Sequence, residues 1–86
     1  MLSFSVVPNP YEHSFAVNYQ VVEDGLVNIE LWDAVGRKVS TLMNETQAKG
    51  SYNQVFEPQI NASGIYYLIL KTGESQSVKK LIHIQN

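Results

Sequence analysis

Residues 26–39 read Leu-Val-Asn-Ile-Glu-Leu-Trp-Asp-Ala-Val-Gly-Arg-Lys-Val, and this stretch decides the fold. Its first half alternates apolar with polar or aromatic side chains, so one set can line a core while the other faces outward; the inward set is Val27, Ile29 and Leu31. The next four residues predict a turn, because Asp33 can bond a backbone N–H further on and Gly36 permits a positive φ. A loop this short joins neighbouring antiparallel strands, which predicts a β-hairpin within one sheet.

Composition limits the classes of protein to which the chain can belong. Its 86 residues suffice for one domain, and 44% hydrophobic with 16% charged residues fits a folded domain. A net charge of -2 provides no basic footprint, so we expect no nucleic-acid partner. The sequence has no cysteine, hence no disulfide framework, and no apolar run of membrane-spanning length. We expect residues 1–86 to form a single domain excised from a longer protein.

Further strands are predicted on both sides of the hairpin from period-two alternation and from the turn residues that bound each segment. Pro8-Asn9-Pro10 ends the first strand, because two prolines remove two backbone donors. Counting the hairpin, the predicted strands cover residues 2–6, 15–21, 26–32, 37–43, 52–57, 65–70 and 77–84.

Three segments carry more specific expectations. In the returning strand of the hairpin, Val39 and Leu42 are the inward residues, and their uneven spacing suggests a bulge or an early end. The polar segment from Asn44 to Gly50 is interpreted as a loop, with a short helix as the alternative. The segment Ile65 to Leu70 is apolar on both faces, which predicts a central strand covered on both faces or nearly so.

Seven short strands without a helical period predict an all-β protein, a seven-stranded antiparallel β-sandwich of the immunoglobulin or fibronectin-III type. The short turn places the third and fourth strands in one sheet. We therefore expect the first, second and fifth strands in one sheet, and the order fourth, third, sixth, seventh in the other. No Cys-Trp-Cys pattern occurs, which argues against an antibody-type domain.

Catalytic groups are sparse. His13 and His83 lie at opposite ends of the chain and are interpreted as a solvated loop residue and a strand residue. Glu23 and Asp24 fit a solvated turn better than half of a calcium site. Asn44 and Asn61 each begin an N-glycosylation pattern that is interpreted as a polar turn. We expect no enzymatic activity, no cofactor and no metal site.

Two surface features could act in recognition. Lys79 and Lys80 lie in the last strand, where lysine can protect an edge strand from pairing with other chains or can serve a receptor. The second feature is an outward set that forms either a docking patch or ordinary cross-strand packing; it comprises Trp32, Ile65, Tyr67 and Ile69. In an excised domain, a second copy could cover this patch as a weak homodimer.

Several short motifs in fixed order resemble the C-terminal sorting domain, type A, of the type IX (Por) secretion system of Bacteroidetes-type bacteria. The resemblance covers the chain from Val7 onward and is carried by Val7-Pro8-Asn9-Pro10-Tyr11, residues 31–39, Gly50-Ser51-Tyr52 with Phe56, residues 62–67, and Lys79-Lys80-Leu81. It implies a sorting role for Lys79, Lys80 and Leu81. It also implies a structural role for the family-motif residues Pro8, Asn9, Pro10, Asp33, Gly36, Arg37, Gly50, Gly64 and Tyr66.

The resemblance further implies a non-catalytic address at the end of an exported cargo. The implied partners are the outer-membrane translocon, a surface sortase and the upstream cargo domain in cis, with passage through the periplasm to the cell surface or the medium. The chain departs from the family pattern at Gln54, at His83 and at its Gln85-Asn86 end. The alternative is an immunoglobulin-like accessory or carbohydrate-binding module of an extracellular enzyme.

Overall fold

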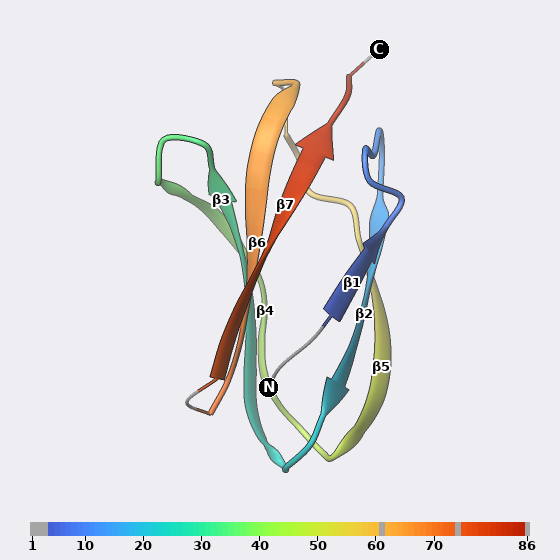
Figure 1. Ribbon diagram of the computed structural model, residues 1–86, viewed down its shortest axis with the longest axis vertical. Helices are drawn as coiled ribbons and strands as arrows, with labels where there is room; N and C mark the ends of the chain where they lie inside the picture. The colour runs from blue at the N-terminus through green and yellow to red at the C-terminus, as the bar shows by residue number, and fades with distance from the viewer. Residues whose placement is uncertain (1–3, 61, 74, 86) are drawn as a thin grey trace.

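Seven antiparallel strands form two packed sheets in the computed structural model, which describes residues 4–60, 62–73 and 75–85 (Figure 1). These residues contain no helix, and therefore none that is long and apolar enough to span a membrane. The strands are β1 (Phe4–Val7), β2 (Phe15–Val21), β3 (Gly25–Asp33), β4 (Lys38–Gln47), β5 (Gly50–Phe56), β6 (Gly64–Thr72) and β7 (Ser75–His83).

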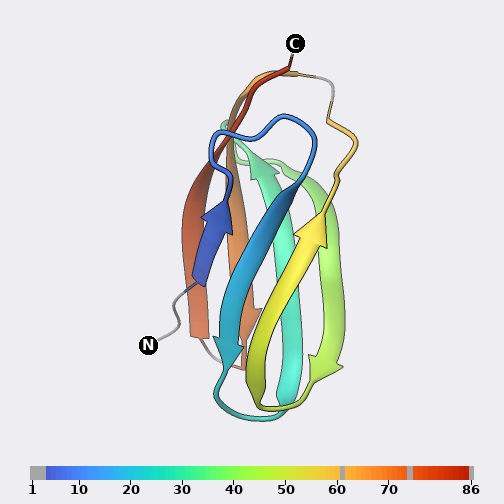
Figure 2. The same ribbon diagram turned by 90° about the vertical axis from the view of Figure 1, so that its right-hand side faces the viewer.

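The sheet order confirms the predicted sandwich. One sheet has the order β1-β2-β5 and the other has the order β4-β3-β6-β7. Figure 2 shows the three-stranded sheet in front of the four-stranded sheet. The polypeptide passes from the small sheet to the large sheet between β2 and β3, and returns between β4 and β5.

The core lies between the two sheets and is filled by alternate side chains of their inner faces. Val27, Ile29 and Leu31 of β3 have 0% exposure, as predicted. Burying each of them stabilises the fold by roughly 1.5–3 kcal/mol. The other buried apolar residues come from β1, β2, β6, β7 and the segment between β1 and β2: Phe4, Tyr11, Phe15, Val17, Tyr19, Val21, Tyr66, Leu68, Leu70 and Leu81.

The turn of the β3–β4 hairpin has the predicted chemistry. Gly36 has a φ of 89°, and its N–H donates to the carbonyl oxygen of Asp33 over 3.2 Å. The Asp33 carboxylate accepts the N–H groups of Val35 and Arg37 at 3.1 and 2.9 Å. It also accepts the Arg37 Nε–H at 3.1 Å. Asp33, Gly36 and Arg37 therefore close this turn together.

The predicted irregularity in β4 is confirmed, and it occurs at two places. Leu31 pairs with Ser40 and Trp32 with Lys38, which leaves Val39 as an extra residue. A second shift, between Ile29 and Glu30, leaves Leu42 as an extra residue in the same way. Leu42 packs against the core as expected, whereas the inward prediction for Val39 is wrong, because this side chain is 43% exposed.

The loop or helix predicted between Asn44 and Gly50 is wrong, because β4 continues to Gln47. Since β3 begins at Gly25, its first residues need a partner, and Gly25 pairs with Gln47. The Gln47 side chain is buried, and its Oε1 accepts a 2.6 Å hydrogen bond from the Tyr19 hydroxyl. Only residues 48 and 49 connect β4 to β5.

The strand β6 is central, as predicted, since it pairs with β3 on one side and β7 on the other. Complete coverage of both faces is not observed, however. Tyr66, Leu68 and Leu70 are buried in the core, whereas the opposite face remains partly open and Ile65 is 41% exposed. The reason is that a two-layer sandwich has no third layer over the outer face of the sheet.

Candidate recognition surface

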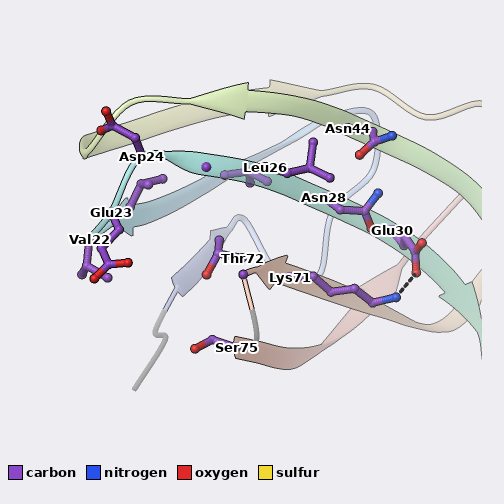
Figure 3. Close-up of a pocket in the computed structure, with 14 residues that line it drawn as sticks. Val22, Glu23, Asp24, Leu26, Asn28, Glu30, Asn44, Lys71, Thr72 and Ser75 are labelled. Carbon is purple, nitrogen blue, oxygen red and sulfur yellow. Dashed lines mark ion pairs between the residues drawn. The ribbon is translucent and has the colours of Figure 1, made fainter.

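A hollow lies at one end of the sandwich, between the β2–β3 turn and the adjoining ends of β6 and β7 (Figure 3). It has a volume of about 670 Å³ and includes the exposed Glu23 and Asp24 in its wall. Its described lining contains neither histidine nor an aromatic ring. Among the residues described, no three His, Cys, Asp or Glu side chains gather where they could hold a metal ion. Among the described lining residues, the hollow therefore shows no aromatic platform of the kind that stacks on sugar.

The sequence-predicted sorting residues all lie on β7, which pairs with β6 at the edge of the four-stranded sheet. Lys80 is exposed and lies opposite Tyr67, on the outer face of the four-stranded sheet. Lys79 leaves the other face of the strand, and its Nζ lies 6.0 Å from the ring centroid of the buried Phe4. Leu81 is fully buried in the core. The three adjacent residues therefore have three different environments.

The N-terminal family motif lies alongside the free edge of the same strand. Asn9 Nδ2 donates to the carbonyl oxygen of Lys80, and Asn9 Oδ1 accepts from the N–H of Ile82, both at 2.9 Å. Tyr11 continues the contact through its N–H to the Ile82 carbonyl and through its own carbonyl to the Ile84 N–H. The segment Pro8-Asn9-Pro10-Tyr11 thus satisfies polar backbone groups that an edge strand would otherwise expose.

The four residues of the predicted patch lie on the outer face of the four-stranded sheet. Trp32 and Tyr67 are direct cross-strand partners, and both are half-buried. Ile69 lies next along β6 on the same face, and Ile65 lies at the strand's start. Val78 was not predicted as part of this patch, but it pairs with Ile69 and is 50% exposed. Its even-numbered position in β7, shared with Lys80, is the signal that would have identified it.

Beside this patch, Glu30 is the centre of a charged cluster that was not predicted. Its carboxylate accepts the Trp32 Nε1–H at 3.0 Å. It also lies 3.3 Å from the Lys71 Nζ and 3.8 Å from the Lys38 Nζ. The hydrogen bond from Trp32 and the two lysines hold the pKa of this nearly buried carboxyl below its usual value. The hydrogen bond to Glu30 orients Trp32. The cluster was not predictable from the sequence, because the β4 bulges determine which β4 residues lie beside Glu30.

Among the remaining motif residues, Gly50 and Gly64 begin β5 and β6, and the Tyr66 hydroxyl donates to the Ala62 carbonyl at 2.8 Å. His13 is exposed, as predicted. His83 is only 5% exposed, and its ring lies 4.6 Å from that of Tyr11. The side chain of Gln54 is half-buried on the inner face of β5, the face that it shares with Tyr52 and Phe56.

Of the two glycosylation patterns, one falls in a strand and the other lies partly outside the described residues. Asn44 is exposed on β4 rather than in a polar turn, which corrects that prediction. Asn61 lies outside the described residues, as do Leu2 of the first predicted strand and Asn86 of the terminal departure.

These features define an immunoglobulin-like β-sandwich with two distinguishing elements. The edge strand β7 is held by hydrogen bonds from the N-terminal segment, and the outer face of the four-stranded sheet is partly apolar. A comparison with models of protein families matches residues 5–85 to the secretion system C-terminal sorting domain. Because the match spans nearly the whole chain, the chain belongs to this family. A comparison with curated proteins found no match.

Membership of the family establishes the general function. The domain is a C-terminal sorting signal for type IX secretion. Such a signal implies export to the cell surface or the extracellular space, and interaction with the type IX machinery and an upstream cargo. Domains of this family are non-catalytic in general.

Proposed function

We propose that residues 1–86 form a single sorting domain that ends a longer exported protein and carries no catalytic activity of its own. In this proposal, the cargo upstream performs the protein's chemistry, and the domain directs it through the periplasm to the outer-membrane translocon. A surface sortase then acts on the delivered protein. The observation that carries the proposal is the position of β7, an edge strand that exposes Lys80 and whose outer edge is held by hydrogen bonds from Asn9 and Tyr11.

Lys79, Lys80 and Leu81 have different roles in this proposal. Lys80 presents its ammonium group to a receptor, since its side chain leaves the outer face of the sheet. Lys79 is exposed too, but its Nζ lies 6.0 Å from the ring centroid of Phe4, so its ammonium group is engaged with the edge of the core. Leu81 is buried in the core and thereby fixes the positions of both lysines along the strand. Loss of Leu81 would therefore act through folding rather than through contact with the machinery.

The experiment is a reporter fused ahead of residues 2–86 in a bacterium that has this secretion system. The variants are Lys79→Ala/Lys80→Ala and a deletion of residues 81–86. The purified double variant must first unfold thermally close to wild type, which separates a recognition defect from misfolding. Retention of the folded double variant in the periplasm is the expected result. Normal delivery of both variants to the surface would contradict a sorting role for this strand.

The edge-protection alternative for the lysine pair makes a different prediction in the same experiment. If the lysines serve only to prevent pairing with other chains, the double variant should aggregate more readily but reach the surface whenever it is folded. Light scattering of the purified variant, measured beside its delivery, distinguishes the two. The accessory-module alternative predicts instead that the wild-type fusion itself is not delivered.

A further inference from the structure

The outer face of the four-stranded sheet joins the two surface features that the sequence presented separately. On this face, Lys80 lies opposite Tyr67, and Tyr67 lies opposite Trp32 in the next strand. One row further along the strands, Val78 lies opposite Ile69. We name these five residues, Trp32, Tyr67, Ile69, Val78 and Lys80, the outer stripe. The stripe crosses three of the four strands of the sheet.

The charge of this face is opposite in sign to the charge of the chain. The described outward positions include three lysines, Lys38, Lys71 and Lys80, and one carboxylate, Glu30. Lys38 and Lys71 both lie within 4.0 Å of Glu30. Among the described carboxylates, none forms an ion pair with Lys80. The chain as a whole carries a net charge of -2. The stripe is therefore an apolar centre beside an available positive charge.

We propose that the outer stripe is a docking surface for a protein of the secretion machinery, and that its occupant has an apolar centre and an acidic rim. This proposal rests on the proposed sorting function and specifies where and how the machinery contacts the domain. The apolar side chains supply the buried centre of the contact, and the lysine selects an acidic partner and aids encounter. Of the lysine pair, Lys80 belongs to the docking surface and Lys79 does not.

Charge argues for a different protein rather than a second copy of this chain. A two-fold contact places the same surface on both subunits, so it would bring the lysines of one face close to those of the other. Like charges brought together across a contact are unfavourable. An acidic partner instead places carboxylates beside Lys80. It also places them beside Lys38 and Lys71, whose side chains keep 48% and 43% exposure.

The test compares pairs of matched variants in a reporter fused ahead of residues 2–86. Lys80→Gln and Lys79→Gln remove the same charge from adjacent positions on opposite faces of β7. Val78→Ser and Val55→Ser remove the same apolar group from exposed strand positions, 50% and 66% exposed, on the outer faces of different sheets. Surface delivery is measured for each, with thermal unfolding of the purified domains as the check on folding.

The proposal expects Lys80→Gln and Val78→Ser to lower surface delivery by roughly fivefold or more, as losses near the centre of an interface do. Lys79→Gln and Val55→Ser should change delivery by less than about twofold. Equal effects within each pair, or no effect of the stripe variants, would overturn the docking surface. Failure of the unmodified fusion to reach the surface would overturn the sorting function itself, which is a distinguishable outcome.

The occupant is tested separately with a photo-crosslinking amino acid at position 78 of the same fusion, and at position 55 as the control. An adduct with a component of the secretion machinery that forms at 78 and not at 55, and that weakens with Lys80→Glu, supports the proposal. A cross-linked dimer of the fusion would identify a second copy as the occupant. A cross-link within one fusion chain would identify the cargo instead. Either result would overturn the assignment of a machinery partner.

Discussion

The side chain of Asn9 donates a hydrogen bond to the backbone carbonyl of Lys80 across 2.9 Å, although 71 positions separate the two residues. The same carboxamide accepts the N–H of Ile82 at 2.9 Å. A carboxamide offers one donor and one acceptor group in nearly the arrangement of a peptide unit. The Asn9 side chain therefore bonds the edge of β7 as a peptide unit of a neighbouring strand would. The N-terminal motif thereby holds the strand that carries the sorting residues.

Replacing Asn9 with aspartate should weaken this hold. A carboxylate cannot donate to the Lys80 carbonyl, and it places negative charge against that oxygen. We expect Asn9→Asp to lower the free energy of unfolding by about 1–2 kcal/mol. Urea denaturation measures this, with Asn44→Asp on exposed β4 as the control, expected within about 0.5 kcal/mol of wild type. An equal effect of the two substitutions would show that the Asn9 bonds contribute little.

The turn of the central hairpin makes a second prediction. Gly36 has a φ of 89°, and a Cβ atom there would meet nothing within 4 Å, so the cost of substitution is a backbone cost. We expect Gly36→Val to destabilise the domain by roughly 1–3 kcal/mol, because a β-branched residue tolerates positive φ poorly. Gly36→Asn should cost less. An unchanged urea midpoint for the valine variant would mean that the turn is of another type.

The sheet order was predictable because its determinants are local. The alternation around Ile29 and the four-residue turn after Trp32 fix the hairpin, and each further strand is bounded by proline, glycine or a polar turn. The end of β4 was not predictable from residues 44–47. These polar residues are in a strand because their backbone pairs with the start of β3, which their own sequence does not determine. Val39 is 43% exposed because it is the extra residue of a bulge, and the position of that bulge depends on the partner strand as well as on β4 itself.

The candidate surface was predictable in part. The membership of Tyr67 and Ile69 on one face follows from the period of a strand. That Lys80 faces the same side required the β6–β7 register. The hold of Asn9 on β7 joins opposite ends of the chain, and no spacing rule connects such positions. The Glu30 cluster likewise depends on strand register and bulges that only the folded chain defines.

The buried Tyr11 hydroxyl predicts a loss of stability at high pH. Burial raises the pKa of Tyr11 to about 12, and the nearby Tyr66 contributes. Because the folded value lies above the ordinary value of 10.0, this contribution to stability is complete below the ordinary pKa and is lost as pH rises toward the folded pKa. We expect Tyr11→Phe to reduce the alkaline decrease in melting temperature. Tyr67→Phe, on the outer face, should leave it in place because Tyr11 remains.

At neutral pH, Tyr11→Phe should not destabilise the domain. The Tyr11 hydroxyl is buried and has no hydrogen-bond partner among the described residues. Removing an unsatisfied buried polar group is expected to gain up to about 1 kcal/mol. Equilibrium denaturation at neutral pH checks this. A clear loss of stability in the phenylalanine variant would mean that the hydroxyl has a partner in solution.

Two carboxylates, Glu30 and Asp33, predict a loss of stability at low pH. The pKa of Glu30 is lowered by the Trp32 hydrogen bond and the neighbouring Lys71 and Lys38, and the pKa of Asp33 is lowered by the Arg37 and Val35 N–H groups. Both folded values lie below the unfolded ones, so the stabilisation is present above the ordinary carboxyl pKa and is lost as pH falls through the folded pKa. We expect the melting temperature to fall in this range, and Glu30→Gln to flatten the dependence. An unchanged profile in that variant would remove Glu30 as a contributor.

The most direct measurement of the central claim is the surface fraction of a reporter that ends in residues 2–86. The fusion is expressed in a bacterium with a working type IX system and in an isogenic strain that lacks its translocon. Protease accessibility on intact cells reports the surface fraction. A sorting domain predicts a protease-accessible reporter in the first strain and a protected, periplasmic reporter in the second. A reporter that remains periplasmic in both strains, or that reaches the surface in both, would contradict the sorting function.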